Sequence, residues 1–131
     1  MRAPVDDTPA RGAMRSDWRS WAAEAGAIGT FMVVAMAATV VLEHPASPIR
    51  QALSDGTVRR VLMGAAMGLT AIGLIYSPPG VRSGAHMNPA VTLTFWRLGR
   101  IGGGDAVGYV LGQFVGGWAG VETARVVVGD R

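Results

Sequence analysis

Long apolar segments dominate this sequence and restrict it to folds that a lipid bilayer can hold. The clearest segment is 21–42, which has 22 residues and a single charged side chain, Glu24. At a rise of about 1.5 Å per residue, such a helix is about 33 Å long, enough to cross the hydrocarbon core. Two further segments, 58–76 and 105–128, have a similar length and are largely apolar. We therefore predict an all-α membrane protein with three transmembrane helices.

The charged residues lie mainly between and beyond these segments. Between the apolar segments we predict a polar loop at 43–57 and a turn at 77–82, each with two prolines. All 12 basic residues are arginines, and they border apolar stretches instead of forming a basic face with interleaved aromatic residues, so we expect no nucleic-acid partner. Residues 1–17 mix Pro, Asp and Arg and are predicted to be a disordered tail before a membrane region, 18–131. With the N-terminus inside, seven arginines lie on the inner side and five on the outer side. This bias favours a cytoplasmic N-terminus in an inner or plasma membrane.

A helix too short to cross a bilayer is predicted between the second and third spans. Asn88 is a favourable N-cap and Pro89 a favourable first helical residue, which together predict a half-helix over 89–98. Ten residues extend about 15 Å, roughly half of the hydrocarbon core. The residues before it, 83–86, favour irregular backbone, which membranes tolerate only where protein or a water-filled cavity covers it. This pattern predicts a re-entrant loop that ends in a half-helix.

The start of the half-helix is a candidate pore site. Asn88 would offer amide N–H donors to water or a small polyol, and the positive end of the helix dipole would repel cations. The alternative interpretation is an ordinary helix cap in a surface loop. The position between two full-length spans favours the pore, because it brings Asn88 close to the bilayer midplane.

Three other polar residues are candidates for supporting roles. Glu24 could accept hydrogen bonds from free N–H groups of the 83–88 loop, or it could face water at the membrane boundary. Gln113 is expected to hydrogen-bond a neighbouring helix or loop. His86 is interpreted as a hydrogen-bonding or packing residue, because the only other histidine is His44 and the chain has no cysteine to complete a metal site. The sequence predicts no metal, no cofactor and no enzyme; a catalytic role for His86 with Glu24 would need a further group and a substrate pocket.

Glycines recur every four residues along the second and third spans. This spacing allows helix backbones to approach closely, and we interpret it as a packing signal. The positions are Gly64, Gly68, Gly104, Gly108, Gly112, Gly116 and Gly120.

Three stretches resemble the major intrinsic protein family, the aquaporins and aquaglyceroporins. The string SGAHMNPAVTLTFWRLGRI is similar to the first Asn-Pro-Ala loop of that family. AAEAGAIGTFMVV resembles its first span and GYVLGQFVGGWAG its third span. The resemblance covers about residues 18–128. It implies one inverted repeat of a fold with six spans and two re-entrant half-helices, assembled as tetramers with one pore per subunit.

The resemblance also implies roles for particular residues. Asn88 would be a pore asparagine, and Pro89 and Ala90 would contact the opposite half-helix. Glu24 would brace the loop. The position of the narrow filter in the second span, often aromatic in the family, falls on Met67 or Gly68, and either residue departs from that pattern. The cytoplasmic half of the pore would be lined, largely by backbone carbonyls, at Ser83, Gly84, Ala85 and His86.

The resemblance accounts for only one of the two repeats of such a channel. The sequence shows no second Asn-Pro-Ala and no filter arginine after it. We expect a passive channel for water or small neutral solutes such as glycerol, present as a truncated or half-length chain, with a second half-channel chain as a possible partner. The alternative is a small non-conducting membrane protein that acts as a packing or regulatory partner.

Overall fold

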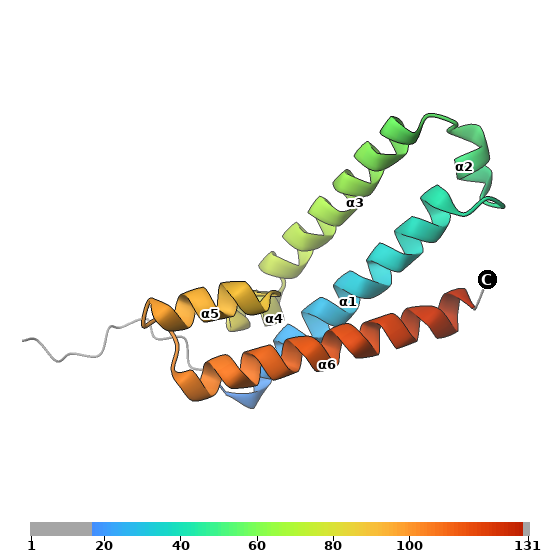
Figure 1. Ribbon diagram of the computed structural model, residues 1–131. Coiled ribbons are helices and arrows are strands. Elements are labelled where there is room, and N and C mark those ends of the chain that lie inside the picture. Colours follow the sequence, from blue (N-terminus) through green and yellow to red (C-terminus); the bar gives the residue numbers. More distant parts are fainter. Residues whose placement is uncertain (1–16, 130–131) are drawn as a thin grey trace, which may run out of the picture.

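The computed structural model describes residues 17–129, which form helices and contain no strand. There are three long helices, α1, α3 and α6; the short helix α2 lies between the first two, and the short helices α4 and α5 lie between α3 and α6 (Figure 1). The bounds are α1 Trp18–Glu43, α2 Pro48–Ala52, α3 Gly56–Tyr76, α4 Pro78–Ser83, α5 Pro89–Arg97 and α6 Gly103–Val128. The long helices match the three predicted spans, and α5 matches the predicted half-helix except that it ends at Arg97 rather than at residue 98.

Two of the described helices are long and apolar enough to cross a membrane. These are α1, with 26 residues, and α3, with 21. α6 also has 26 residues, but it contains many glycines, Gln113 and charged residues near both ends, which lower its mean hydropathy. A third membrane span therefore stays a prediction, while the helix itself is present.

The last residue of the predicted tail caps α1. Residues 1–16 lie outside the described part of the chain. Asp17, which we assigned to the disordered tail, is instead the N-cap of α1, and its Oδ1 accepts a hydrogen bond from Ser20 N at 3.0 Å. An aspartate at this position satisfies one of the free N–H groups of the first helical turn.

Two short helices correct the sequence prediction, which placed a polar loop at 43–57 and a turn at 77–82. In α2 and α4 the first residue is a proline that follows a serine N-cap. Ser77 Oγ accepts from Gly80 N at 3.1 Å, and Ser47 caps α2 in the same way. Serine followed by proline is a helix start for the same reason as Asn88-Pro89, because the cap accepts an orphan N–H and proline needs none.

α1 and α6 pack along each other through glycines (Figure 1). A Cβ atom added at Gly116 would overlap the backbone of Ala25, and one added at Gly120 would overlap the backbone of Gly29. Gly108 and Gly112 lie equally close to Trp21. We call these four glycines of α6 the glycine seam. The predicted close packing is confirmed there, whereas Gly64, Gly68 and Gly104 have no atom within 4 Å of the added Cβ within the described chain.

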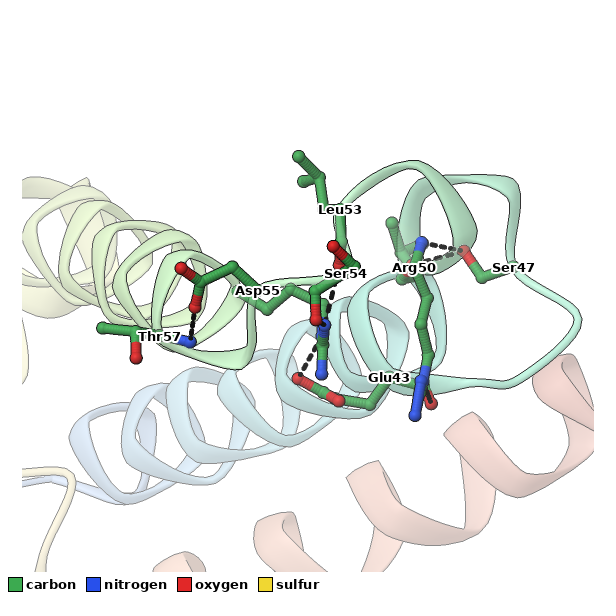
Figure 2. Close-up of polar contacts among 9 residues, drawn as sticks. Glu43, Ser47, Arg50, Leu53, Ser54, Asp55 and Thr57 are labelled. Carbon is green, nitrogen blue, oxygen red and sulfur yellow. Dashed lines mark hydrogen bonds and ion pairs between the residues drawn. The ribbon is translucent and has the colours of Figure 1, made fainter.

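An arginine closes the connection between α1 and α3. Arg59 Nε lies 3.1 Å from Glu43 Oε1, and Arg59 Nη1 donates to the carbonyl oxygens of Leu53 and Ser54 at 2.7 and 2.9 Å. Arg50 Nε adds a bond of 2.9 Å to the carbonyl oxygen of Glu43. Figure 2 shows this connection, with Ser47 bonded to Arg50 in α2 and Asp55 bonded to Thr57 at the start of α3. The last turn of α1 is thereby tied to the start of α3, at the end of the molecule opposite α4.

Candidate functional site

A buried glutamate of α1 is the centre of a polar cluster. Glu24 is completely buried, and its carboxylate accepts four hydrogen bonds. Ser83 Oγ and His86 N donate to Oε1, each at 2.8 Å. Met87 N donates to Oε2 at 2.6 Å and Gln113 Nε2 donates to the same atom at 3.0 Å. Such a site suits an ionised carboxylate, which can only accept, because burying a charge requires that its hydrogen-bonding capacity be met.

The loop that Glu24 holds has a strained backbone. Gly84 has φ 84°, and Ala85 and Met87 both have φ 46°. A residue with a Cβ loses about 1–2 kcal/mol in this left-handed region. The bonds to Glu24 offset that loss, and Ala85 N adds a bond of 3.1 Å to Ser83 Oγ. The 83–88 loop therefore keeps its shape through its contacts with α1.

The loop ends at the N-terminus of α5, where Asn88 is exposed. Asn88 Oδ1 accepts from Ala90 N at 2.8 Å, and Pro89 is the first helical residue. Because the cap uses the oxygen, the NH2 group of Asn88 points away from the helix end, and it makes no hydrogen bond within residues 17–129. The nine residues of α5 extend about 13 Å, less than half of a hydrocarbon core.

Thr92 links the loop to α6. Gln113 Nε2 donates both to Glu24 and to Thr92 Oγ1, the latter at 3.0 Å. Thr92 Oγ1 also lies 3.1 Å from His86 Nδ1 and donates to the carbonyl oxygen of Asn88 at 3.3 Å. Gln113 Oε1 has no partner in the described part of the chain. The two bonds from its NH2 group fix the orientation of this amide, since a rotated amide would turn its oxygen toward the carboxylate.

Aromatic rings cover the remaining side of the loop. The ring of His86 lies 4.6 Å from that of Phe95 and 4.8 Å from that of Tyr109, measured between centroids. Tyr109 is completely buried, and its hydroxyl donates to the carbonyl oxygen of Ser83 at 2.8 Å. His86 is thus a hydrogen-bonded packing residue in this structure. Its Nε2 atom has no partner among the described residues.

The structure brings some of the predicted site residues together and leaves others apart. Glu24 contacts the 83–88 loop directly, and Gln113 bonds to Glu24 of α1 and Thr92 of α5. The water-facing alternative for Glu24 is wrong because its side chain is buried. On α3, Met67 is half-buried and Gly68 is exposed, and neither takes part in these hydrogen bonds. The filter role of either residue stays a prediction.

The seven residues predicted to line a pore differ in exposure. The side chains of Ser83 and His86 are buried, and the carbonyl of Ser83 is already bonded to Tyr109, as described above. Ala85 and Pro89 are half-buried, and the exposed ones are Gly84, Asn88 and Ala90. The pore-lining role of all seven residues stays a prediction. The three exposed residues have side-chain or backbone atoms that can face a pore.

Sequence reasoning missed Thr92 and Tyr109. A signal for each was present: Thr92 follows Asn88 by one helical turn, and Tyr109 precedes Gln113 by one turn and so shares its helix face. Within residues 17–129, no group of three or more His, Cys, Asp or Glu side chains is placed to hold a metal ion. The cluster is therefore a network of hydrogen bonds around one carboxylate.

Comparison with known proteins identifies the family. The family model described as "Major intrinsic protein" matches residues 13–130. Aquaporin Z of Photorhabdus laumondii is 36% identical over 66 residues, which are 50% of this chain and 28% of that protein. Probable aquaporin AqpM of Archaeoglobus fulgidus is 45% identical over 54 residues, 41% of this chain and 22% of that protein.

A third relative is the glycerol uptake facilitator protein-like 6 of Lactiplantibacillus plantarum. It is 34% identical over 89 residues, which are 68% of this chain and 35% of that protein. The chain thus spans about a third or less of the length of these relatives. No solved structure matches it. With a match over residues 13–130 and two helices fit to cross a bilayer, the chain belongs to the major intrinsic protein family of integral membrane channels, which are not enzymes.

Proposed function

We propose that this chain forms the Asn88-bearing half of a passive channel for water or small neutral solutes such as glycerol. In this proposal α1, α3 and α6 span the membrane, and α5 is a half-helix that begins near the midplane. The observation that carries it is the cluster around Glu24, which fixes a strained loop so that α5 begins at an exposed asparagine. A loop that served only as a connection would need neither the buried carboxylate nor the strain.

The geometry at Asn88 suits a neutral solute. The exposed NH2 group can donate to a water or hydroxyl oxygen that passes it. The N-terminus of α5 contributes roughly half a positive charge at the same place, which repels cations. The relatives named above include aquaporins and a glycerol uptake facilitator. Water and glycerol are both neutral and both have an oxygen that can accept from this NH2 group.

A complete pore also needs a wall opposite Asn88. We infer that a second segment, on this or another chain, provides that wall with its own half-helix, and that the assembled subunits form tetramers. Four arginines lie at one end of the molecule, where α1 begins and where α4 and α5 end: Arg19, Arg82, Arg97 and Arg100. None of these four is in an ion pair within residues 17–129. This excess of positive charge supports a cytoplasmic N-terminus in the cell membrane.

The test is osmotic permeability in vesicles of the source cells' own membranes, where any second half is present. Stopped-flow light scattering compares cells with the intact gene, with the gene deleted, and with Asn88→Asp. The deletion should lower water or glycerol permeability. The aspartate variant keeps a capping oxygen, so it should fold, but its negative charge should weaken cation exclusion. Equal permeability to both solutes with and without the gene would refute the channel and favour a non-conducting membrane protein.

A further inference from the structure

Two arginines border a hollow at the end of the molecule where α1 begins. The hollow measures about 570 Å³ and lies between the first turns of α1 and α4, with Arg19, Arg82 and Trp18 in its lining. Both arginines are exposed, and the guanidinium carbon of Arg19 lies 5.7 Å from the centre of the Trp18 ring. Both ion pairs found within residues 17–129 lie at the opposite end of the long helices. The acidic residue nearest in sequence, Asp17, caps α1.

The hollow continues into an apolar groove between α1 and α3. A second depression of about 310 Å³ shares Ala22, Ala23 and Pro79 with the first and extends to Thr30 and Leu74. From Ala22 to Thr30, α1 rises about 12 Å, so the groove runs from the arginines well toward the middle of a bilayer. An entrance with two arginines and a tryptophan thus leads into an apolar groove between α1 and α3.

We propose that this groove binds an anionic phospholipid, with its phosphate between Arg19 and Arg82 and one acyl chain along α1 and α3. Arginine binds phosphate oxygens through several N–H donors, and a tryptophan is most stable at the headgroup level of a membrane. The apolar continuation favours a lipid over free phosphate, which would use only the entrance. The proposal rests on the membrane insertion of the proposed channel and not on its conduction.

A matched pair of double variants tests this site. Arg19→Gln with Arg82→Gln removes two positive charges from the groove. Arg97→Gln with Arg100→Gln removes two positive charges from exposed arginines that do not line the groove but lie near the same end of the molecule. Native mass spectrometry of the full chain in detergent then measures binding of dioctanoyl phosphatidylglycerol and dioctanoyl phosphatidylcholine. An arginine near an anionic headgroup changes affinity by about fivefold, and two by about thirtyfold.

The expected result is tighter binding of phosphatidylglycerol than of phosphatidylcholine. Affinity for phosphatidylglycerol should fall about thirtyfold in the groove variant and less than about threefold in the control. Equal losses of affinity in the two variants would mean that the overall positive charge of this end, and not the groove, attracts the lipid. That result would overturn the proposal. Equal affinity for the two lipids would also overturn it. Competition by inorganic phosphate at an affinity equal to that of the lipid would assign a phosphate site in place of a lipid site.

The lipid site and the channel can fail separately. Lipid binding is measured on the isolated chain, whereas conduction is measured on native membrane vesicles. A chain that binds phosphatidylglycerol selectively but adds no permeability refutes only the channel. A chain that conducts and shows no lipid preference refutes only the lipid site.

Discussion

Replacing Glu24 by glutamine should unfold the 83–88 loop, although the two side chains have the same shape. The new NH2 group would stand where one carboxylate oxygen was. The hydroxyl of Ser83 and the amide of Gln113 could rotate to accept from it. Each carboxylate oxygen, however, also accepts from a backbone N–H, that of His86 on Oε1 and that of Met87 on Oε2. Whichever oxygen is replaced, one buried backbone N–H then faces another donor.

The magnitude follows from counting these bonds. A buried N–H without a partner costs about 1–3 kcal/mol, and each of the three remaining bonds weakens by about 1 kcal/mol because none of them involves a charged group any longer. Relief from burying a charge offsets part of this sum. We therefore expect Glu24→Gln to lower the free energy of unfolding by about 3 kcal/mol.

Equilibrium unfolding in mixed micelles, with SDS as denaturant and circular dichroism as the signal, measures this loss. Hydrogen exchange of the amides at 85–87 reports whether the loop opens. The control is Glu122→Gln, which removes an exposed pair with Arg125 at 3.2 Å and should change stability by less than about 0.5 kcal/mol. If Glu24→Gln matched the control in stability and left the exchange of the 85–87 amides unchanged, the loop would not depend on the carboxylate.

Three further changes follow from the packing and the hydrogen bonds. Gly116→Ala should separate α1 from α6 and lower the free energy of unfolding by about 1–3 kcal/mol, whereas Gly104→Ala, which meets nothing, should be nearly neutral in the same SDS titration. Thr92→Val keeps the side-chain volume but leaves one N–H of Gln113 unpaired, so we expect a loss of about 1–3 kcal/mol together with faster exchange at 85–87. Arg59→Met leaves two carbonyl oxygens and a carboxylate without their donor, and it should speed proteolysis of the connection between α1 and α3; an unchanged cleavage rate would show that this arginine does not hold the connection.

The long helices could be predicted from the sequence, and the short ones were missed for an identifiable reason. Apolar runs of bilayer length predict the helices at 21–42 and 58–76 to within a few residues of α1 and α3. The prolines in 43–57 and 77–82 indicate a loop and a turn, yet Pro48 and Pro78 each begin a short helix because a serine caps it. The asparagine and proline at the start of α5 follow the same rule and were interpreted correctly.

The site could be predicted only in part, because its partners depend on the alignment of α1 against α6. A carboxylate in a membrane span and a loop with free N–H groups make the contact between Glu24 and the loop one of the two positions that the sequence allows for this side chain; its burial decides between them. That Gln113 reaches both Glu24 and Thr92 depends on how far one helix is shifted along the other. The glycine seam sets this shift, and a shift of one helical turn, about 5.4 Å, would move Gln113 out of reach. No local pattern around Thr92 or Tyr109 contains that information.

The polar cluster and the glycine seam together determine where Asn88 lies. Holding Ala85 and Met87 at positive φ costs about 1–2 kcal/mol for each residue, so the loop would relax without the bonds that α1 and α6 supply. Those bonds require Glu24 and Gln113 to meet, and these two side chains meet only when the helices that carry them are in close contact. A substitution that separates α1 from α6 should therefore free the loop as well as destabilise the packing. Exposed Asn88 would then lose its fixed position although no residue near it had changed.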